Sequence, residues 1–276
     1  MRVLFIRYTV ITMDRILLSA FLISLLVSIS GNLAVFRRAS FLVAGVAHSA
    51  LAGVALSLLL SSFGLELDYF ALAVAIAIAF AILASMVSKF SDIDTGIAIS
   101  FALSMALAVI FISMIRGQSA KVWSFLFGEI FLVTTQDLVY LTFSATIAVL
   151  LFGLLYEKII FLLFDPEGAE ASGINSRIID AVLVAIIAIS VVSAMRAVGA
   201  ILAYSIFVAP AAIAKEFSKS VEQSLIITFA VAFASLIIGI LASILLPISA
   251  SALAAFIASA LYLVAFYIKN VITEAS

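Results

Sequence analysis

The amino-acid sequence predicts an all-α fold, a polytopic membrane helix bundle with eight or nine transmembrane helices. Of its 276 residues, 67% are hydrophobic and only 11% are charged, against roughly 25% charged residues in soluble domains. The mean hydropathy is +1.41, and several uncharged stretches reach the about 20 residues that a spanning helix needs. A protein with so few charged side chains could not cover its surface with polar groups in water. We therefore expect the lipid bilayer to be its solvent.

The composition also excludes several classes of function. A net charge of -1 leaves no basic surface for nucleic acid. The absence of cysteine excludes disulfides, thiolate metal ligands and cysteine nucleophiles. The chain lacks GxSxG and HExxH motifs and has one histidine, which argues against an intramembrane hydrolase. It also lacks a GxxxxGK[ST] phosphate loop, so ATP hydrolysis by that route would require another chain.

The candidate spans are long stretches without Asp, Glu, Lys or Arg. In chain order they are 16–36, 39–65, 69–88, 95–115, 138–156, 181–195 (which can extend to Arg177), 197–214 and 223–268. As one helix, the last stretch would be about 69 Å long, more than twice the about 30 Å hydrocarbon core, so it must fold back. Pro247 lies near its middle and is poorly placed in a helix interior. We predict one domain, residues 1–276, with nine helices, or eight if one is re-entrant.

Lysines and arginines indicate the orientation, because cytoplasmic loops carry an excess of them. Nine spans with an outside N-terminus place eight cations inside and six outside. The inner set is Arg37, Arg38, Lys89, Lys158, Arg177, Lys215, Lys219 and Lys269, and the outer set is Arg2, Arg7, Arg15, Arg116, Lys121 and Arg196. Loss of one span would move the N-terminus inside. No small-residue cleavage pattern follows the first 14 residues, so we expect them to be retained.

Residues 116–136 are predicted to lie at the membrane interface. Trp123, Phe125 and Phe127 stand beside charged residues there, and aromatic rings anchor amphipathic segments at this depth.

A second segment, 165–173, reads as a short helix on the inner side. Asp165 suits the N-cap, Pro166 the first helical position, Glu167 the first turn and Gly173 the C-terminal stop. So well specified a solvent-facing helix is unusual in a membrane protein, although a simple connector would look the same.

His48 is the only histidine, and it lies inside the uncharged stretch 39–65. Ionisable groups inside a span are functional hypotheses by default. A stripe of small residues at intervals of four, Gly45, Ser49, Gly53 and Ser57, runs beside it and predicts close approach of another helix. The imidazole is therefore expected to point into the protein interior, either as an interhelical hydrogen-bonding group or as an ion ligand.

A metal pathway would need further ligands, and the candidates are few. We expect Asp94 to be an N-cap with Thr95, and Glu66 and Asp68 to be solvated. Asp137 lies near the outer amphipathic segment. Glu129, flanked by Gly128 and apolar residues, is the carboxylate least easily assigned to a surface role.

Several separated segments resemble the membrane permease subunits of the zinc, manganese and iron importers of the ATP-binding-cassette (ABC) class. They are FRRASFLVAGVAHSALAGVAL (36–56), DTGIAI (94–99), FLFGEIFLVTTQDL (125–138), FDPEGAEASGI (164–174) and MRAVGAILAYSIFVAPAAIA (195–214). They span most of the chain in the family's order, which is more specific than any one motif.

The resemblance implies a permease rather than an enzyme, with a divalent metal ion as substrate and no permanently bound cofactor. It implies a homodimer in the cell membrane that receives its ion from an extracytoplasmic metal-binding protein and is driven by cytoplasmic ATPase subunits through alternating access. The family's cytoplasmic coupling helix maps onto Asp165, Pro166, Glu167, Ala169 and Gly173. Gly168 and Ser172 stand where the family usually has bulky apolar residues.

The family's metal path maps onto His48. However, the family frequently has an aspartate one turn earlier, where this chain has Ala44. Glu129 replaces a common asparagine, and we hypothesise that it compensates for the missing carboxylate. Arg196 and Gly199 match a helix junction in the family, which we interpret as an interfacial arginine snorkelling beside a tight turn.

The alternative is a secondary transporter or channel that acts without an ATPase, with Glu129, Asp94 or His48 as its relay. It would predict inverted repeats, and the sequence shows no convincing pair.

Overall fold

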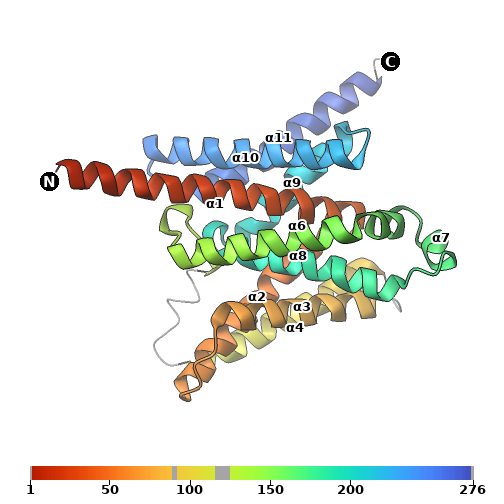
Figure 1. Cartoon of the computed structure of the whole chain (residues 1–276), viewed down its shortest axis with the longest axis horizontal. Coiled ribbons are helices and arrows are strands. Elements are labelled where there is room, and N and C mark those ends of the chain that lie inside the picture. Colours follow the sequence, from red (N-terminus) through yellow and green to blue (C-terminus); the bar gives the residue numbers. More distant parts are fainter. Residues whose placement is uncertain (1, 89–91, 116–124, 275–276) are drawn as a thin grey trace.

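The computed structural model describes residues 2–88, 92–115 and 125–274, and this part is a bundle of helices that run along one direction (Figure 1). The elements are α1 (Arg2–Phe36), α2 (Leu42–Ser62), α3 (Tyr69–Val87), α4 (Ile93–Met114), the 3-10 turn η1 (Ile130–Leu132), α6 (Thr135–Phe164), α7 (Pro166–Ala171), α8 (Ser176–Val198), α9 (Ala200–Phe217), α10 (Val221–Leu245) and α11 (Ala250–Glu274).

Within the described residues, nine helices are long and apolar enough to cross a membrane. The prediction of a membrane helix bundle is therefore confirmed, in its nine-helix form. The stretch 223–268 divides as expected, because α10 ends at Leu245 and α11 begins at Ala250, with Pro247 in the turn between them. The boundary before α9 lies at Gly199, three residues later than the charge of Arg196 suggested.

Polar side chains cap the helix starts, which explains where many of them begin. Asp68 accepts a hydrogen bond from the backbone N–H of Ala71 at the start of α3. Thr134 and Asp137 form a reciprocal capping box at the start of α6. Asn175 and Ser220 cap α8 and α10 by accepting from the backbone N–H groups of Ile178 and Gln223. The prediction of Asp94 as an N-cap was wrong: α4 begins at Ile93, so Asp94 lies in the first turn.

The bundle has a buried centre and an apolar exterior. Helices α1, α2 and α8 are the most buried spans, whereas α4, α6 and α11 expose most of their side chains. Large exposed side chains on these outer helices are apolar, such as Leu154, Phe256 and Tyr267. This pattern suits a protein whose surroundings are lipid.

The two ends of the bundle differ, and we refer to them as the α7 end and the opposite end. The α7 end holds the C-termini of α1 and α6, the short helix α7 and the N-terminus of α8 (Figure 1). The opposite end holds the turn 63–68, the segment 125–134, Gly199 and the turn 246–249.

The interfacial prediction for residues 116–136 is only partly testable, because Trp123 lies outside the described residues. From Phe125 onward, residues 125–127 are helical and η1 follows after a two-residue break, so the described part of the segment is not one continuous helix.

Candidate functional site

The small-residue stripe of α2 faces α3 and α4. A Cβ atom built on Gly53 would lie 2.6 Å from the Cα atom of Ala73, so the α2 and α3 backbones are in direct contact. Ser49 and Ser57 are buried, and the Ser57 hydroxyl donates to the carbonyl of Leu67 at 3.0 Å. A Cβ atom on Gly45 would meet Ile97 of α4 at 3.6 Å. The predicted close helix approach is thus confirmed, and it is tightest at Gly53.

His48 lies in the second turn of α2, counted from the α7 end, and is partly exposed. Its Nδ1 is 2.9 Å from the carbonyl oxygen of Ala44. A carbonyl can only accept, so Nδ1 donates this hydrogen bond, and in the neutral imidazole the lone pair then lies on Nε2, the arrangement that a metal ligand requires. The ring packs edge-on against Phe101 of α4, with centroids 4.9 Å apart.

An aromatic cluster separates His48 from a polar cavity at the α7 end. Phe41 lies 5.7 Å from Phe101 and 6.2 Å from Tyr204, measured between ring centroids. Phe41 and Tyr204 also line a cavity of about 420 Å³. Its charged lining residues are Arg38, Asp94, Lys215 and Glu216. Two cations and two carboxylates give this cavity a balanced charge, which suits a passage more than a tight binding site.

Glu129 lies far from His48. It precedes η1 at the opposite end, whereas about 20 Å of α2 separates His48 from that end at 1.5 Å per residue. The Oε1 atom of Glu129 is buried without a hydrogen-bond partner in the described part. No three His, Asp or Glu residues come together to hold a metal ion among the residues that the structure describes. The structure thus gives the compensation hypothesis for Glu129 no geometric support.

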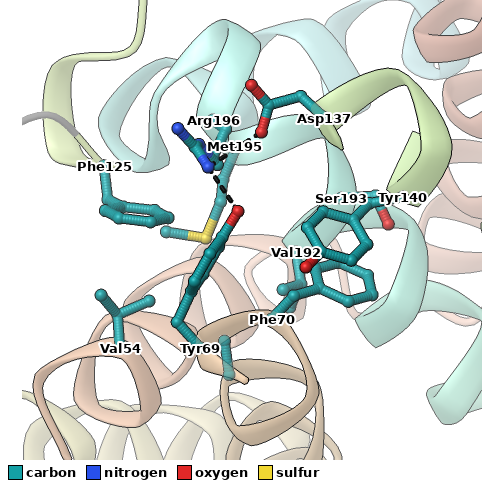
Figure 2. A pocket seen from close by; sticks show the side chains of 11 residues that line it. Val54, Tyr69, Phe70, Phe125, Asp137, Tyr140, Val192, Ser193, Met195 and Arg196 are labelled. Carbon is teal, nitrogen blue, oxygen red and sulfur yellow. Dashed lines mark hydrogen bonds and ion pairs between the residues drawn. The ribbon is translucent and has the colours of Figure 1, made fainter. Parts of the chain in front are cut away.

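An ion pair with a buried carboxylate lies at the opposite end of the bundle (Figure 2). Arg196 of α8 lies between Asp137 and Tyr69, with its Nη1 atom 3.0 Å from Oδ1 of Asp137. The same nitrogen donates a hydrogen bond to the Tyr69 hydroxyl. The guanidinium carbon is 5.3 Å from the ring centroids of both Tyr69 and Phe125, a distance at which cation–π attraction operates. The side chain of Asp137 is only 3% exposed.

The side chain of Arg196 is 32% exposed, so its interpretation as an interfacial arginine stays a prediction, to which the structure adds the ion pair with Asp137. The cavity beside it, about 10 Å³ in volume, has room for about one water molecule. The predicted tight turn is confirmed: Gly199 has φ +93° and packs directly against Phe127 and Gly128.

Asp68 also has a partner that its expected solvation did not include. Its Oδ2 accepts a hydrogen bond of 2.7 Å from the hydroxyl of Tyr140, and the ring of Tyr140 stacks on Phe70. Glu66 is exposed, as expected.

The short helix α7 forms as the sequence predicts. Asp165 accepts from the backbone N–H of Gly168 at 2.9 Å, Pro166 is the first helical residue, and Gly173 follows the C-cap with φ +80°. Ala169 is fully buried, so it anchors the helix to the bundle. The exposed face consists of Pro166, Glu167, Glu170 and Ala171.

Three ion pairs among the described residues were not predicted from the sequence: Asp137–Arg196, Arg37–Asp180 and Lys269–Glu216. The sequence contained part of the information that predicts the Asp137–Arg196 pair. Thr134 and Asp137 have capping-box spacing, which places Asp137 inside the first turn of a helix rather than in a loop.

In the part of the chain that the structure describes, nine helices long and apolar enough to cross a membrane define a multi-pass membrane protein. Residues 9–269 match the ABC 3 transport family, and the chain belongs to this family. The resemblance seen in the sequence is thereby confirmed.

Individual relatives match over nearly the whole chain. An uncharacterized membrane protein of Synechocystis is 30% identical over 94% of this chain and 91% of its own length. The manganese transport system membrane protein MntC of Listeria monocytogenes is 26% identical over 92% of this chain and 89% of its own length. The solved structure of PsaBC from Streptococcus pneumoniae in complex with Fab matches with a TM-score of 0.81 and 23% identity, over 92% of this chain and 91% of that chain. This last likeness concerns the fold.

Proposed function

We propose that the chain is the permease subunit of an ATP-driven importer of a divalent metal ion. The observation that carries the proposal is the match to the ABC 3 transport family over residues 9–269. Manganese is the first cargo to test, because MntC of Listeria monocytogenes is named for manganese transport. Zinc and iron(II) are the other ions in the same class.

The α7 end is proposed to face the cytoplasm and to receive the ATPase subunits. Support comes from charge: Arg38, Arg177, Lys215 and Lys219 are exposed at this end, where the excess of cations is expected. Support also comes from α7, which offers Pro166, Glu167 and Glu170 to solvent on a helix anchored by Ala169. The extracytoplasmic metal-binding protein would then deliver the ion at the opposite end.

We propose that the ion passes His48. Its free Nε2 lone pair, the Phe41–Phe101–Tyr204 cluster and the polar cavity lie in sequence toward the α7 end. Because Ala44 supplies no carboxylate, a single chain offers His48 alone at this level. A weak site suits transport, since the ion must also leave. Two copies of the chain would supply two such histidines, which is consistent with a homodimer.

The ATPase requirement separates this proposal from a transporter or channel acting alone. The test is capture of ABC ATPase subunits from the source organism by the detergent-solubilised chain, comparing the parent with Glu167→Arg. Glu66→Arg is the matched control, because Glu66 is an exposed glutamate at the opposite end.

We expect the parent and the control to capture the ATPase and Glu167→Arg to lose most of that capture. A folded parent that captures no ATPase, yet carries metal ions across a membrane, would favour the transporter that acts alone.

A further inference from the structure

A cluster of Arg37, Ser85 and Asp180 lies at the α7 end and has no role in the ion path described above. It joins three helices that are far apart in the sequence. Arg37 directly follows α1, Ser85 lies in the last turn of α3, and Asp180 lies in the second turn of α8.

The three side chains contact one another directly. The Nη2 atom of Arg37 is 2.8 Å from Oδ1 and 3.0 Å from Oδ2 of Asp180. The Ser85 hydroxyl donates to Oδ2 of Asp180 at 2.5 Å and accepts from Nη2 of Arg37 at 3.0 Å. Every pair in the cluster is therefore bonded, which leaves little freedom for one helix end to move without the others.

The cluster is largely shielded from solvent. The side chain of Arg37 is 17% exposed and that of Asp180 is 27% exposed. Burial lowers the pKa of Arg37 below its ordinary value, and the Asp180 carboxylate partly offsets that shift. Removing Asp180 would leave a desolvated cation without its counter-charge.

Both flanks of α7 are attached to this cluster. On the C-terminal side, the Ser176 hydroxyl donates to Oε1 of Glu170 at 2.5 Å, and Ser176 lies one turn before Asp180 on α8. On the N-terminal side, Phe164 packs against Phe36, the residue before Arg37, with ring centroids 5.6 Å apart. The helix α7 is thus linked to the start of α8 on its C-terminal side, and the residue pair Phe164–Phe36 links its N-terminal flank to the end of α1.

We propose that Arg37, Ser85 and Asp180 form the joint that transmits movement of α7 to α1 and α3. This inference rests on the proposed function, in which ATPase subunits bind α7. Movement of α7 would shift the N-terminus of α8 through Ser176, and the cluster would carry that shift to α1 and α3. Because α3 contacts α2 at Gly53, the displacement would reach the helix that bears His48.

The first test measures rigidity in the chain alone. The chain has no cysteine, so two spin labels can be placed at exposed positions, Glu167→Cys on α7 and Met86→Cys beside Ser85. We expect a narrow distance distribution in the parent and a clearly broader one with Asp180→Asn. Ser85→Ala should broaden it less, because the ion pair remains. Arg177 is an exposed cation that, with Arg37, Ser85 and Asp180, lines a cavity of about 760 Å³. Arg177→Gln is therefore the matched control and should leave the distribution unchanged.

The second test measures coupling in proteoliposomes that contain the chain and its ATPase. We expect Asp180→Asn to retain ATPase binding while the Mn²⁺ imported per ATP hydrolysed falls between about twofold and thirtyfold. The exchanged pair, Arg37→Asp with Asp180→Arg, should restore part of this ratio. If both the distance distribution and the transport ratio of Asp180→Asn stay at parental values, the proposal of a joint is wrong, while the proposed function stands. A parent that imports no Mn²⁺ with ATP would overturn the proposed function on which the joint rests.

Discussion

Single residues decide how this bundle accommodates charge. The Asp137 carboxylate is 3% exposed and would be costly to bury alone, and Arg196 supplies its counter-charge at 3.0 Å. Tyr69 and Phe125 complete the site with a hydroxyl acceptor and a ring face. The arrangement also ties the start of α6 to the end of α8.

Replacing Asp137 with Asn tests how much the ion pair with Arg196 contributes to the free energy of unfolding. The amide can still accept from Thr134, so the helix cap is kept, but Arg196 loses its counter-ion. We expect a loss of about 1–3 kcal/mol in the free energy of unfolding, measured by thermal denaturation in detergent. Glu66→Gln is the control, because Glu66 is exposed at the same end. Equal stability of both variants would mean that the pair contributes nothing.

His48 is the residue on which the proposed ion path depends. With the lone pair on Nε2, removing the imidazole should lower ATP-driven Mn²⁺ uptake by about tenfold or more, without loss of ATPase binding. His48→Ala measured against Thr146→Ala, an exposed change on α6, checks this by radiolabelled uptake into proteoliposomes. Parental uptake in His48→Ala would remove this residue from the path.

At the scale of the helix, α2 contains two glycines with different surroundings. Replacing each with alanine distinguishes the effect of close helix packing from the effect of intrinsic helix propensity. A methyl group on Gly53 would meet the Ala73 backbone at 2.6 Å, whereas one on Gly45 would make an ordinary contact of 3.6 Å. We expect Gly53→Ala to cost about 1–3 kcal/mol because α3 must move away. Gly45→Ala should be neutral or stabilise by up to about 1 kcal/mol. Thermal unfolding of the two variants tests this, and equal effects would contradict the packing described here.

The helices were predictable from the sequence because a membrane-spanning helix needs only length and the absence of charge. Pro247 also marked the break in 223–268, and Asp165, Pro166 and Gly173 marked α7, since caps act within a few residues. The pairing of Asp137 with Arg196 was not predictable in this way, because it joins positions 59 residues apart in chain order. The separation of Glu129 from His48 agrees with the predicted orientation, which places Arg116 and Lys121 of the segment 116–136 on the outer side and Arg37 and Arg38 on the inner side.

At the scale of the whole molecule, the bundle has two chemically distinct ends. At the opposite end, Arg196 pairs with Asp137 next to a cavity with room for about one water molecule. The α7 end contains the polar cavity beside Phe41 and Tyr204 and the cluster of Arg37, Ser85 and Asp180.

The central claim is that this chain imports a divalent metal ion only when ATPase subunits drive it. The most direct measurement is Mn²⁺ uptake into proteoliposomes that contain the chain, its captured ATPase and the extracytoplasmic binding protein, with and without ATP. The account predicts uptake that requires ATP and all three components. Equal uptake by the chain alone, without ATP or ATPase, would contradict it.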